Sequence, residues 1–195
     1  MGTYFVSIPY EFFVGWATSF CCPPNNLKEY ILVLNKLISI VGAGNWLISH
    51  DRIGPKVLEL VEGRYGSEVE LCNIGSAGLA LLDYLHGQEL MLVVDACLQG
   101  KQPGEICIVE PCLDTLNINI TSVHQIGPLE TLTFAKRLFP EKMPQRIRLI
   151  MVETNGIDEK TEAIACQEVL AILDREIETW QNTKYCNGQH DVINL

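Results

Sequence analysis

Short apolar runs recur along the chain and are separated by segments in which apolar residues appear at a longer spacing. Leu90–Val94 is apolar at every position, which is typical of a central strand covered on both faces. Leu37–Val41, Val69–Ile74, Ile106–Val109 and Ile147–Val152 are further runs of strand length. The pattern predicts a strand at each of these places.

Between the runs, apolar residues recur every three or four positions, as on one face of a helix. This spacing predicts helices beginning near Pro55 and covering Leu79–Leu85, Pro128–Leu138 and about Glu162–Trp180. Pro55 suits a first helical turn because its ring fixes φ and its missing N–H has no partner there anyway. Strands that alternate with helices predict an α/β fold, a three-layer sandwich with helices on both faces of the sheet.

The chain begins with an apolar, aromatic segment that fits neither common targeting class. It has no basic residue before Lys28 and contains Pro9 and Glu11, whereas a signal peptide has a basic start and a membrane span needs about twenty apolar residues. We expect residues 1–35 to be a poorly ordered extension outside the main domain. Two origins stay open: an upstream stretch included by an early start codon, or a genuine appendage.

We expect the main domain to occupy residues 36–181, a length that suits a single α/β core. Residues 182–195 are rich in Asn, Asp and Gly and are expected to form a frayed tail.

Composition narrows the functional classes. The formal net charge is −10 and the pI is about 4.8, so binding to nucleic acid is disfavoured. The densest basic stretch, between Lys136 and Arg148, has the pattern of a solvated surface. The chain has eight cysteines but no CxxC pair, and Cys72, Cys107 and Cys166 fall in apolar runs. We therefore expect reduced thiols, a cytoplasmic protein and no membrane association.

Polar residues with chemical potential follow the predicted strands. In an open α/β sheet, ligands bind outside the carboxyl ends of the strands. The segments at those ends are 44–54, 75–78, 95–96 and 122–127. All four segments are therefore candidates to face one cleft.

Three side chains in these segments, Asp51, Asp95 and His124, suggest a metal site. Two carboxylates and one imidazole suit a divalent first-row ion and leave positions for outside ligands, but they do not distinguish nickel from zinc. Each residue also has a structural explanation. Asp51 can interact with the positive end of the following helix, Asp95 can meet solvent at its strand end, and His124 can be a hydrogen-bonded loop histidine.

Other candidates are weaker. We expect His50 to be a surface residue, because adjacent side chains usually diverge, and His86 to complement a helix end beside Gly87. Ser76 and Ser122 lack the GxSxG context of a nucleophile.

A strand followed by Gly42-Ala43-Gly44 is also compatible with a dinucleotide-binding loop. However, Leu47 occupies the position of the third glycine, and the helix begins too late, near Pro55.

The same segments resemble the nickel-iron hydrogenase maturation endopeptidases between about Leu37 and Leu173. The motifs that carry the resemblance are Gly44-Asn45-x-Leu47 with Asp51 and Gly54, Gly75-Ser76-Ala77-Gly78, Val94-Asp95-Ala96, Pro103-Gly104 and Ser122-x-His124-Gln125-x-Gly127. They occur in the family's order and at similar spacings.

The resemblance implies a twisted, mostly parallel five-stranded sheet between helices. It also implies an aspartyl-type endopeptidase that removes the C-terminal peptide of a hydrogenase large-subunit precursor after nickel insertion. The family's metal-contacting positions fall on Asp51, Asp95 and His124, which are thereby also the catalytic candidates. Nickel would arrive with the precursor, so no cofactor is expected to be bound permanently.

The chain departs from the family at three positions: His50 replaces a usual acid, Arg52 replaces a small residue, and Ser76 replaces threonine. Arg52 has three possible roles, which are to pair with an acid, to contact the substrate tail or to narrow the cleft. The alternative function is a noncatalytic nickel-sensing or chaperone-like protein on the same fold.

Overall fold

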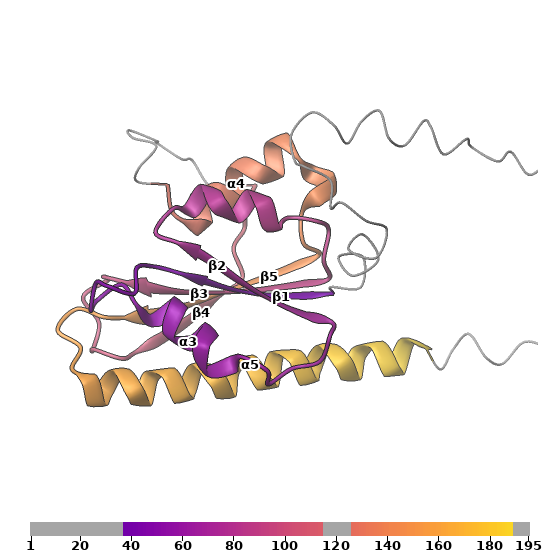
Figure 1. Ribbon diagram of the computed structural model, residues 1–195. Helices are drawn as coiled ribbons and strands as arrows, with labels where there is room; N and C mark the ends of the chain where they lie inside the picture. Colours follow the sequence, from indigo (N-terminus) through magenta and orange to yellow (C-terminus); the bar gives the residue numbers. More distant parts are fainter. Residues whose placement is uncertain (1–36, 115–125, 189–195) are drawn as a thin grey trace, which may run out of the picture. The chain divides into compact units, whose positions relative to one another are not determined.

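The computed structural model describes residues 37–114 and 126–188 (Figure 1). A five-stranded sheet forms there in the order β2-β1-β3-β5-β4. Its strands are β1 (Ile38–Ala43), β2 (Val69–Gly75), β3 (Leu90–Cys97), β4 (Ile106–Val109) and β5 (Arg146–Glu153). All five lie where the hydrophobic pattern predicts them, and each end agrees with the prediction to within three residues.

The strands β2, β1, β3 and β5 run parallel, and only the edge strand β4 is antiparallel to its neighbour. Ile38 at the start of β1 pairs with Val69 on one side and with Leu90 on the other. The carboxyl ends of β1, β2 and β3 therefore meet at one edge of the sheet. This confirms the mostly parallel sheet that the resemblance implies.

Helices cover both faces of the sheet (Figure 1). The helices are α3 (Ile53–Val61), the 3-10 helix η1 (Gly78–Tyr84), α4 (Pro128–Leu138), the 3-10 turn η3 (Pro140–Lys142) and α5 (Glu159–Gly188). The helices α3 and α5 pack together on one face, and α4 packs with η1 on the other. The predicted three-layer sandwich is confirmed.

The sheet separates two hydrophobic cores, and β3 contributes to both. Leu90, Leu92 and Val94 point into the core beneath α3 and α5, whereas Met91 and Val93 point into the core beneath α4 and η1. All five side chains are almost fully buried. A strand covered on both faces has no position for a polar side chain, which explains the uninterrupted apolar run.

Two helices differ from the prediction. The segment expected to be a short α-helix at Leu79–Leu85 is the 3-10 helix η1, in which Leu81 is fully buried.

The last helix, α5, continues to Gly188. Residues 182–188, expected to belong to a frayed tail, are therefore helical. Its final turns are held from the side. The indole N–H of Trp180 donates to Glu89 Oε2 at 2.9 Å, and Lys184 Nζ lies 2.8 Å from Glu89 Oε1 and over the Trp180 ring.

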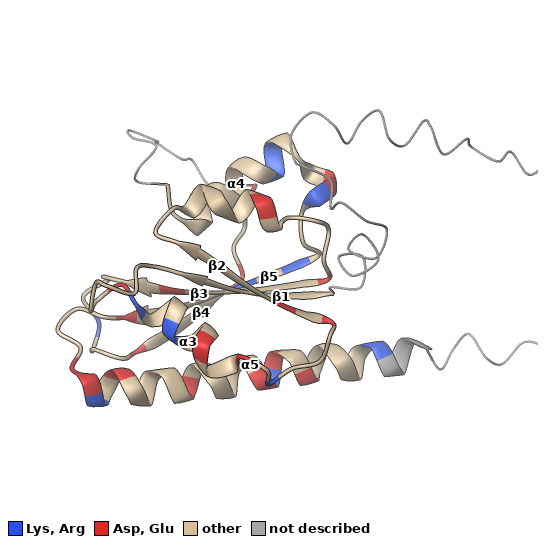
Figure 2. Cartoon of the chain, in the orientation of Figure 1, with Lys and Arg blue, Asp and Glu red and all other residues tan. Residues whose placement is uncertain are grey.

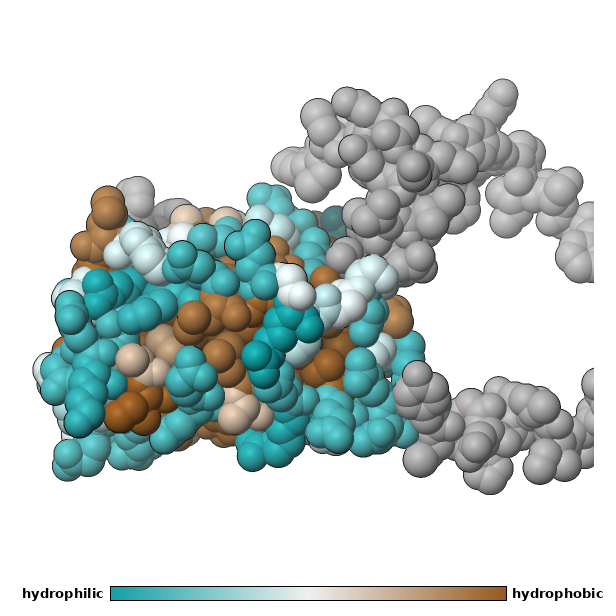
Figure 3. Space-filling model, turned by 60° about the horizontal axis from the view of Figure 1, so that its bottom comes forward, coloured by the Kyte–Doolittle hydropathy of each residue, from teal (hydrophilic) through white to brown (hydrophobic). Residues whose placement is uncertain are grey.

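The surface carries both acidic and apolar regions. Acidic side chains recur along α5 (Figure 2), and the face in Figure 3 shows apolar patches between hydrophilic residues. Basic residues of the stretch from Lys136 to Arg148 pair with acids: Lys136 with Asp114 at 2.8 Å, and Arg148 with Glu110 at 3.2 Å. These pairs explain why the stretch forms no basic patch. Within the described ranges, no helix has both the length and the apolarity that crossing a bilayer requires.

Gly54, in the first turn of α3, allows the closest approach of a helix to the sheet. A Cβ atom there would lie 2.2 Å from the carbonyl oxygen of Ala43 and 2.7 Å from that of Val94. Both contacts are to backbone that is fixed in the sheet, so the helix itself would have to move. A glycine is therefore required at this position.

We predict that Gly54→Ala lowers the free energy of unfolding by about 2 kcal/mol or more, measured by urea denaturation. At an unconstrained helical position the same change would stabilise the protein by about 1 kcal/mol, so the sign of the effect is diagnostic. Glu59→Ala, at an exposed position of the same helix, is the control and should change the stability by less than about 0.5 kcal/mol. An unchanged or raised stability of Gly54→Ala would contradict the close approach.

Candidate active site

The loop between β1 and α3 is closed by hydrogen bonds that place Asp51 beside the end of β1. The backbone N–H of Asn45 donates both to the Asp51 carbonyl oxygen, at 2.8 Å, and to its Oδ2, at 2.9 Å. Gly44 has φ +122°, and a Cβ there would lie 1.9 Å from the Asp51 carbonyl oxygen. Asp51 is therefore positioned by backbone contacts that depend on glycine at position 44.

The loop after β2 meets Asp51 from the other side. Ser76 Oγ donates to Asp51 Oδ2 at 3.5 Å, a long hydrogen bond. The side chain of Ser76 is exposed, and its hydrogen-bond partner is an acid rather than a histidine. This geometry makes Ser76 a neighbour of Asp51, and it does not form a serine–histidine pair.

Asp95 lies within β3, two residues before the strand ends, and is half-buried. Its Oδ1 accepts the backbone N–H of Ala96 at 2.8 Å. The pKa of Asp95 is raised to about 7: burial has the largest effect, the Ala96 N–H opposes it, and the negative charges of Asp51 and Glu130 add to it. The pKa shift thus reports that the three carboxylates share one region of the molecule.

Sequence reasoning missed Glu130, which lies in the first turn of α4. Its Oε2 accepts the backbone N–H of Gly127 at 3.1 Å, as a glutamate three residues into a helix commonly does. The segment Gly127-Pro128-Leu129-Glu130 carries this signal, because proline marks the first helical position.

The segment that carries His124 rejoins the described chain at the same edge of the sheet. A Cβ on Gly78 would lie 2.3 Å from the carbonyl oxygen of Ile126, so the backbone at Ile126 packs against the loop after β2. His124 and Ser122 lie outside the described residues. Three of the four predicted segments are therefore together at one edge, and the placement of His124 stays a prediction.

Within residues 37–114 and 126–188, no three histidine, cysteine, aspartate or glutamate side chains are close enough to hold a metal ion. Asp51 and Asp95 are two donors that face the same region. A complete metal site with these carboxylates needs a ligand from beyond those ranges or from another molecule.

Arg52 forms an ion pair with an acid, one of the three roles open to it. Its Nε and Nη2 donate to the two carboxylate oxygens of Glu162, each at 2.7 Å, and Lys56 Nζ lies 3.1 Å from Glu162 Oε2. Glu162 is only 1% exposed, yet the hydrogen bonds from Arg52 lower its pKa despite this burial. The pair ties the loop containing Asp51 to the start of α5.

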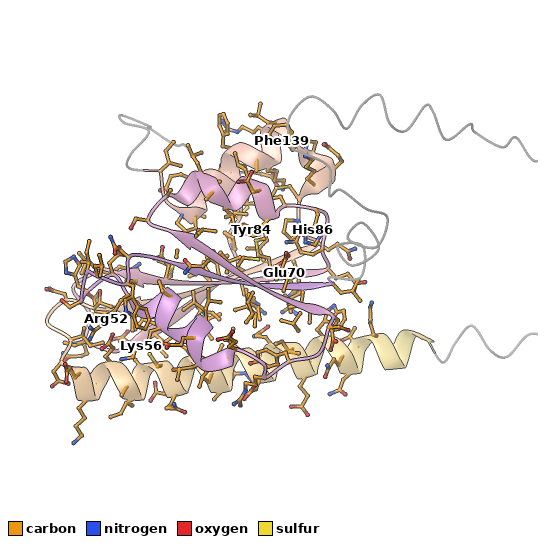
Figure 4. All side chains as sticks on the ribbon, in the orientation of Figure 1. Arg52, Lys56, Glu70, Tyr84, His86 and Phe139 are labelled. Atoms are coloured by element: carbon orange, nitrogen blue, oxygen red, sulfur yellow. The ribbon has the colours of Figure 1, made fainter. Side chains whose placement is uncertain are left out.

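The described ranges contain two further histidines, His50 and His86. His50 is exposed, as predicted, and its carbonyl oxygen accepts the Thr154 hydroxyl at 2.7 Å. His86 Nε2 lies 3.2 Å from Glu70 Oε2, at the opposite edge of the sheet from Arg52 and Lys56 (Figure 4). The expected interaction of His86 with a helix end is replaced by this pairing with Glu70.

Comparisons with known proteins agree with this architecture. The family model "HycI: Hydrogenase maturation protease" matches residues 55–181. The hydrogenase 2 maturation protease of Escherichia coli (strain K12) is 29% identical over 149 residues, covering 70% of this chain and 90% of the relative. The hydrogenase expression/formation protein HoxM of Cupriavidus necator is 26% identical over 127 residues, covering 63% of this chain and 62% of the relative.

Solved structures show the same fold. The hydrogenase-maturating endopeptidase HybD of E. coli superposes with a TM-score of 0.56 at 26% identity, over 71% of this chain and 93% of that one. HybD of Thermococcus kodakarensis gives a TM-score of 0.56 at 20% identity, over 71% and 97% of the two chains, and supports the fold alone.

The raised pKa of Asp95 predicts a pH-dependent cost in stability. The folded pKa lies above the ordinary value of 3.8, so the unfolded chain ionises first and the folded state is increasingly penalised as pH rises. The penalty grows by about 1.4 kcal/mol per pH unit from about pH 4 and is complete above about pH 7.

The variant Asp95→Asn lacks this penalty, so its stability relative to wild type should rise by about 2 kcal/mol between pH 5.5 and pH 8. Urea denaturation with a chelator present measures this difference. A difference that stays constant over the same pH range would contradict the shifted pKa.

Proposed function

Because this chain belongs to the hydrogenase maturation protease family, we propose that it cleaves the large-subunit precursor of a nickel-iron hydrogenase. In this proposal the enzyme removes the precursor's C-terminal peptide after nickel has been inserted. The observation that carries the proposal is the meeting of Asp51 and Asp95 at the carboxyl edge of the sheet, beside the backbone at Ile126. The enzyme acts in the cytoplasm, where the precursor would be loaded.

The electrostatics of Asp51 and Asp95 favour a cationic ligand. Burial raises the energy of the charged form of Asp95, and the negative charge of Asp51 adds to this cost. A divalent cation between them would offset this cost and favour the ionised form of Asp95. Carboxylate and imidazole donors are compatible with nickel, and thiolates of the precursor would supply further ligands.

In this proposal, nickel is part of the substrate and is the element that the enzyme recognises. Asp51, Asp95 and His124 complete the coordination of nickel that the precursor carries, so only a loaded precursor is held in place. Asp51 already has a fixed orientation through the Asn45 N–H and the Ser76 hydroxyl. The alternative role of Asp51, instead of binding nickel, is that of a general base that accepts a proton from the water attacking the scissile carbonyl.

We predict that the purified enzyme shortens a nickel-loaded precursor and leaves a nickel-free precursor intact. Mass spectrometry of the precursor before and after incubation measures the loss of the C-terminal peptide. Binding of the loaded precursor without any shortening would favour the noncatalytic nickel-sensing or chaperone-like alternative.

We also predict that His124→Ala reduces processing of the loaded precursor by at least about a hundredfold, as expected when a ligand that holds the substrate is lost. The matched control is His50→Ala, because the His50 side chain is exposed. Circular dichroism and thermal melting check that both variants fold. Processing by His124→Ala at the rate of the control would refute the ligand role.

A further inference from the structure

A second recognition feature lies immediately after Asp51 in the chain. A surface cavity of about 290 Å³ is lined by Trp46, Arg52, Lys56, Glu159 and Glu162. Arg52 and Lys56 reach it from the start of α3, and the two glutamates from the start of α5 (Figures 2 and 4). The cavity therefore adjoins the proposed active site without sharing its carboxylates.

The cavity retains hydrogen-bond donors after its internal ion pairs are counted. Arg52 uses Nε and Nη2 on Glu162, which leaves Nη1 without a partner among the described residues. Lys56 makes one contact to Glu162, and an ammonium group has three donors. The side chains of Arg52 and Lys56 are 29% and 28% exposed, whereas that of Glu162 is 2% exposed. Both carboxylate oxygens of Glu162 therefore have partners, whereas Arg52 and Lys56 remain partly exposed to solvent.

The cavity is lined by two cations and two acids, and the unused hydrogen-bond donors belong to the cations. Two cations face a single buried carboxylate, and α3 contributes no acid in its first turn. Glu159, whose negative charge contributes to raising the pKa of Arg52, is exposed, so water screens its charge. An incoming carboxylate would bind the remaining donors of Arg52 and Lys56 through charge-assisted hydrogen bonds.

The rim of the cavity favours a polypeptide over a small inorganic anion. Trp46 is 48% exposed and Leu47 is 89% exposed, both in the loop that holds Asp51. Large apolar side chains at such exposure offer area to a chain that passes over the loop. The combination suits an anionic group with apolar atoms beside it.

We propose that this cavity binds a carboxylate of the substrate polypeptide, with Arg52 and Lys56 as the specificity-determining residues. The inference rests on the proposed function, because it places the substrate chain on the loop that carries Asp51. The carboxylate has two possible sources, an acidic side chain or the free end of the chain. Both present the same group to the cavity.

Three synthetic peptides distinguish the sources: acetyl-Ala-Leu-Ala with a free carboxylate, the same peptide amidated, and acetyl-Ala-Glu-Ala amidated. Binding to the full-length enzyme is followed by NMR through the indole N–H signal of Trp46, assigned with Trp46→Phe. We expect saturable shifts with at least one peptide that carries a carboxylate and none with the neutral peptide. Equal shifts with all three peptides, or none with any, would overturn the proposal.

The variant Lys56→Gln removes one cation and leaves the two bonds between Arg52 and Glu162 in place. We expect it to weaken binding of the carboxylate peptide about three- to tenfold, and Lys56→Arg to restore most of the affinity. The matched control is Lys160→Gln, which removes an exposed lysine near the same helix start that does not line the cavity. Equal weakening by Lys56→Gln and Lys160→Gln would show a general charge effect and overturn the site.

A parallel assay of precursor processing separates this inference from the proposed function. If peptide binding depends on Lys56 but the enzyme does not cut the loaded precursor, the proposed function is refuted and the carboxylate site is supported. The opposite outcome would refute the site and keep the function. In that case the wild type, Lys56→Gln and Lys160→Gln all process the precursor at the same rate, and the enzyme does not discriminate between the peptides.

Discussion

The close contact between α3 and the sheet is the constraint on which the candidate active site at the carboxyl edge of the sheet depends. Gly54 brings the helix backbone against the carbonyl oxygens of Ala43 and Val94, one at the end of β1 and the other in β3. This contact fixes where the preceding loop can run. Asp51, three residues earlier, is thereby held above the strand ends and close enough to Asp95 to raise its pKa. A looser helix would separate the two carboxylates.

The loop between β1 and α3 carries a negative charge at Asp51 and a positive charge at the next residue, Arg52. Asp51 belongs to a region that it shares with Asp95 and Glu130, where like charges repel and a cation would be stabilised. The next residue, Arg52, turns toward α5 and brings positive charge to a neighbouring cavity. A substrate with a metal at one point and a carboxylate at another would therefore meet complementary groups in a defined orientation.

Glu162 holds Arg52 in position and so connects α5 to the loop between β1 and α3. It is buried, and its charge is tolerated because Arg52 forms a two-point contact with it and Lys56 adds a second cation. The pairing spans 110 positions in the sequence, from the loop after β1 to the first turn of α5. It joins the loop between β1 and α3 to α5, the helix that also covers one of the two hydrophobic cores. Arg52, which departs from the family pattern, thus has a structural role, and its remaining donor is left for recognition.

The sequence by itself determined the order and type of nearly every element, because buried strands and amphipathic helices have distinct hydrophobic periods. It also placed Asp51, Asp95 and Ser76 at one edge, since parallel strands bring their carboxyl ends together. Local patterns did not give the 3-10 form of η1 or the length of α5. The end of α5 depends on contacts of Trp180 and Lys184 with Glu89, which are distant in sequence.

Only the tertiary structure decided which charges meet. The contact of Arg52 with Glu162, the effect of Glu130 on Asp95 and the burial that raises the pKa of Asp95 arise from packing between elements. A residue's charge is visible in the sequence, but its energy depends on the water that folding removes and on the partners that folding supplies.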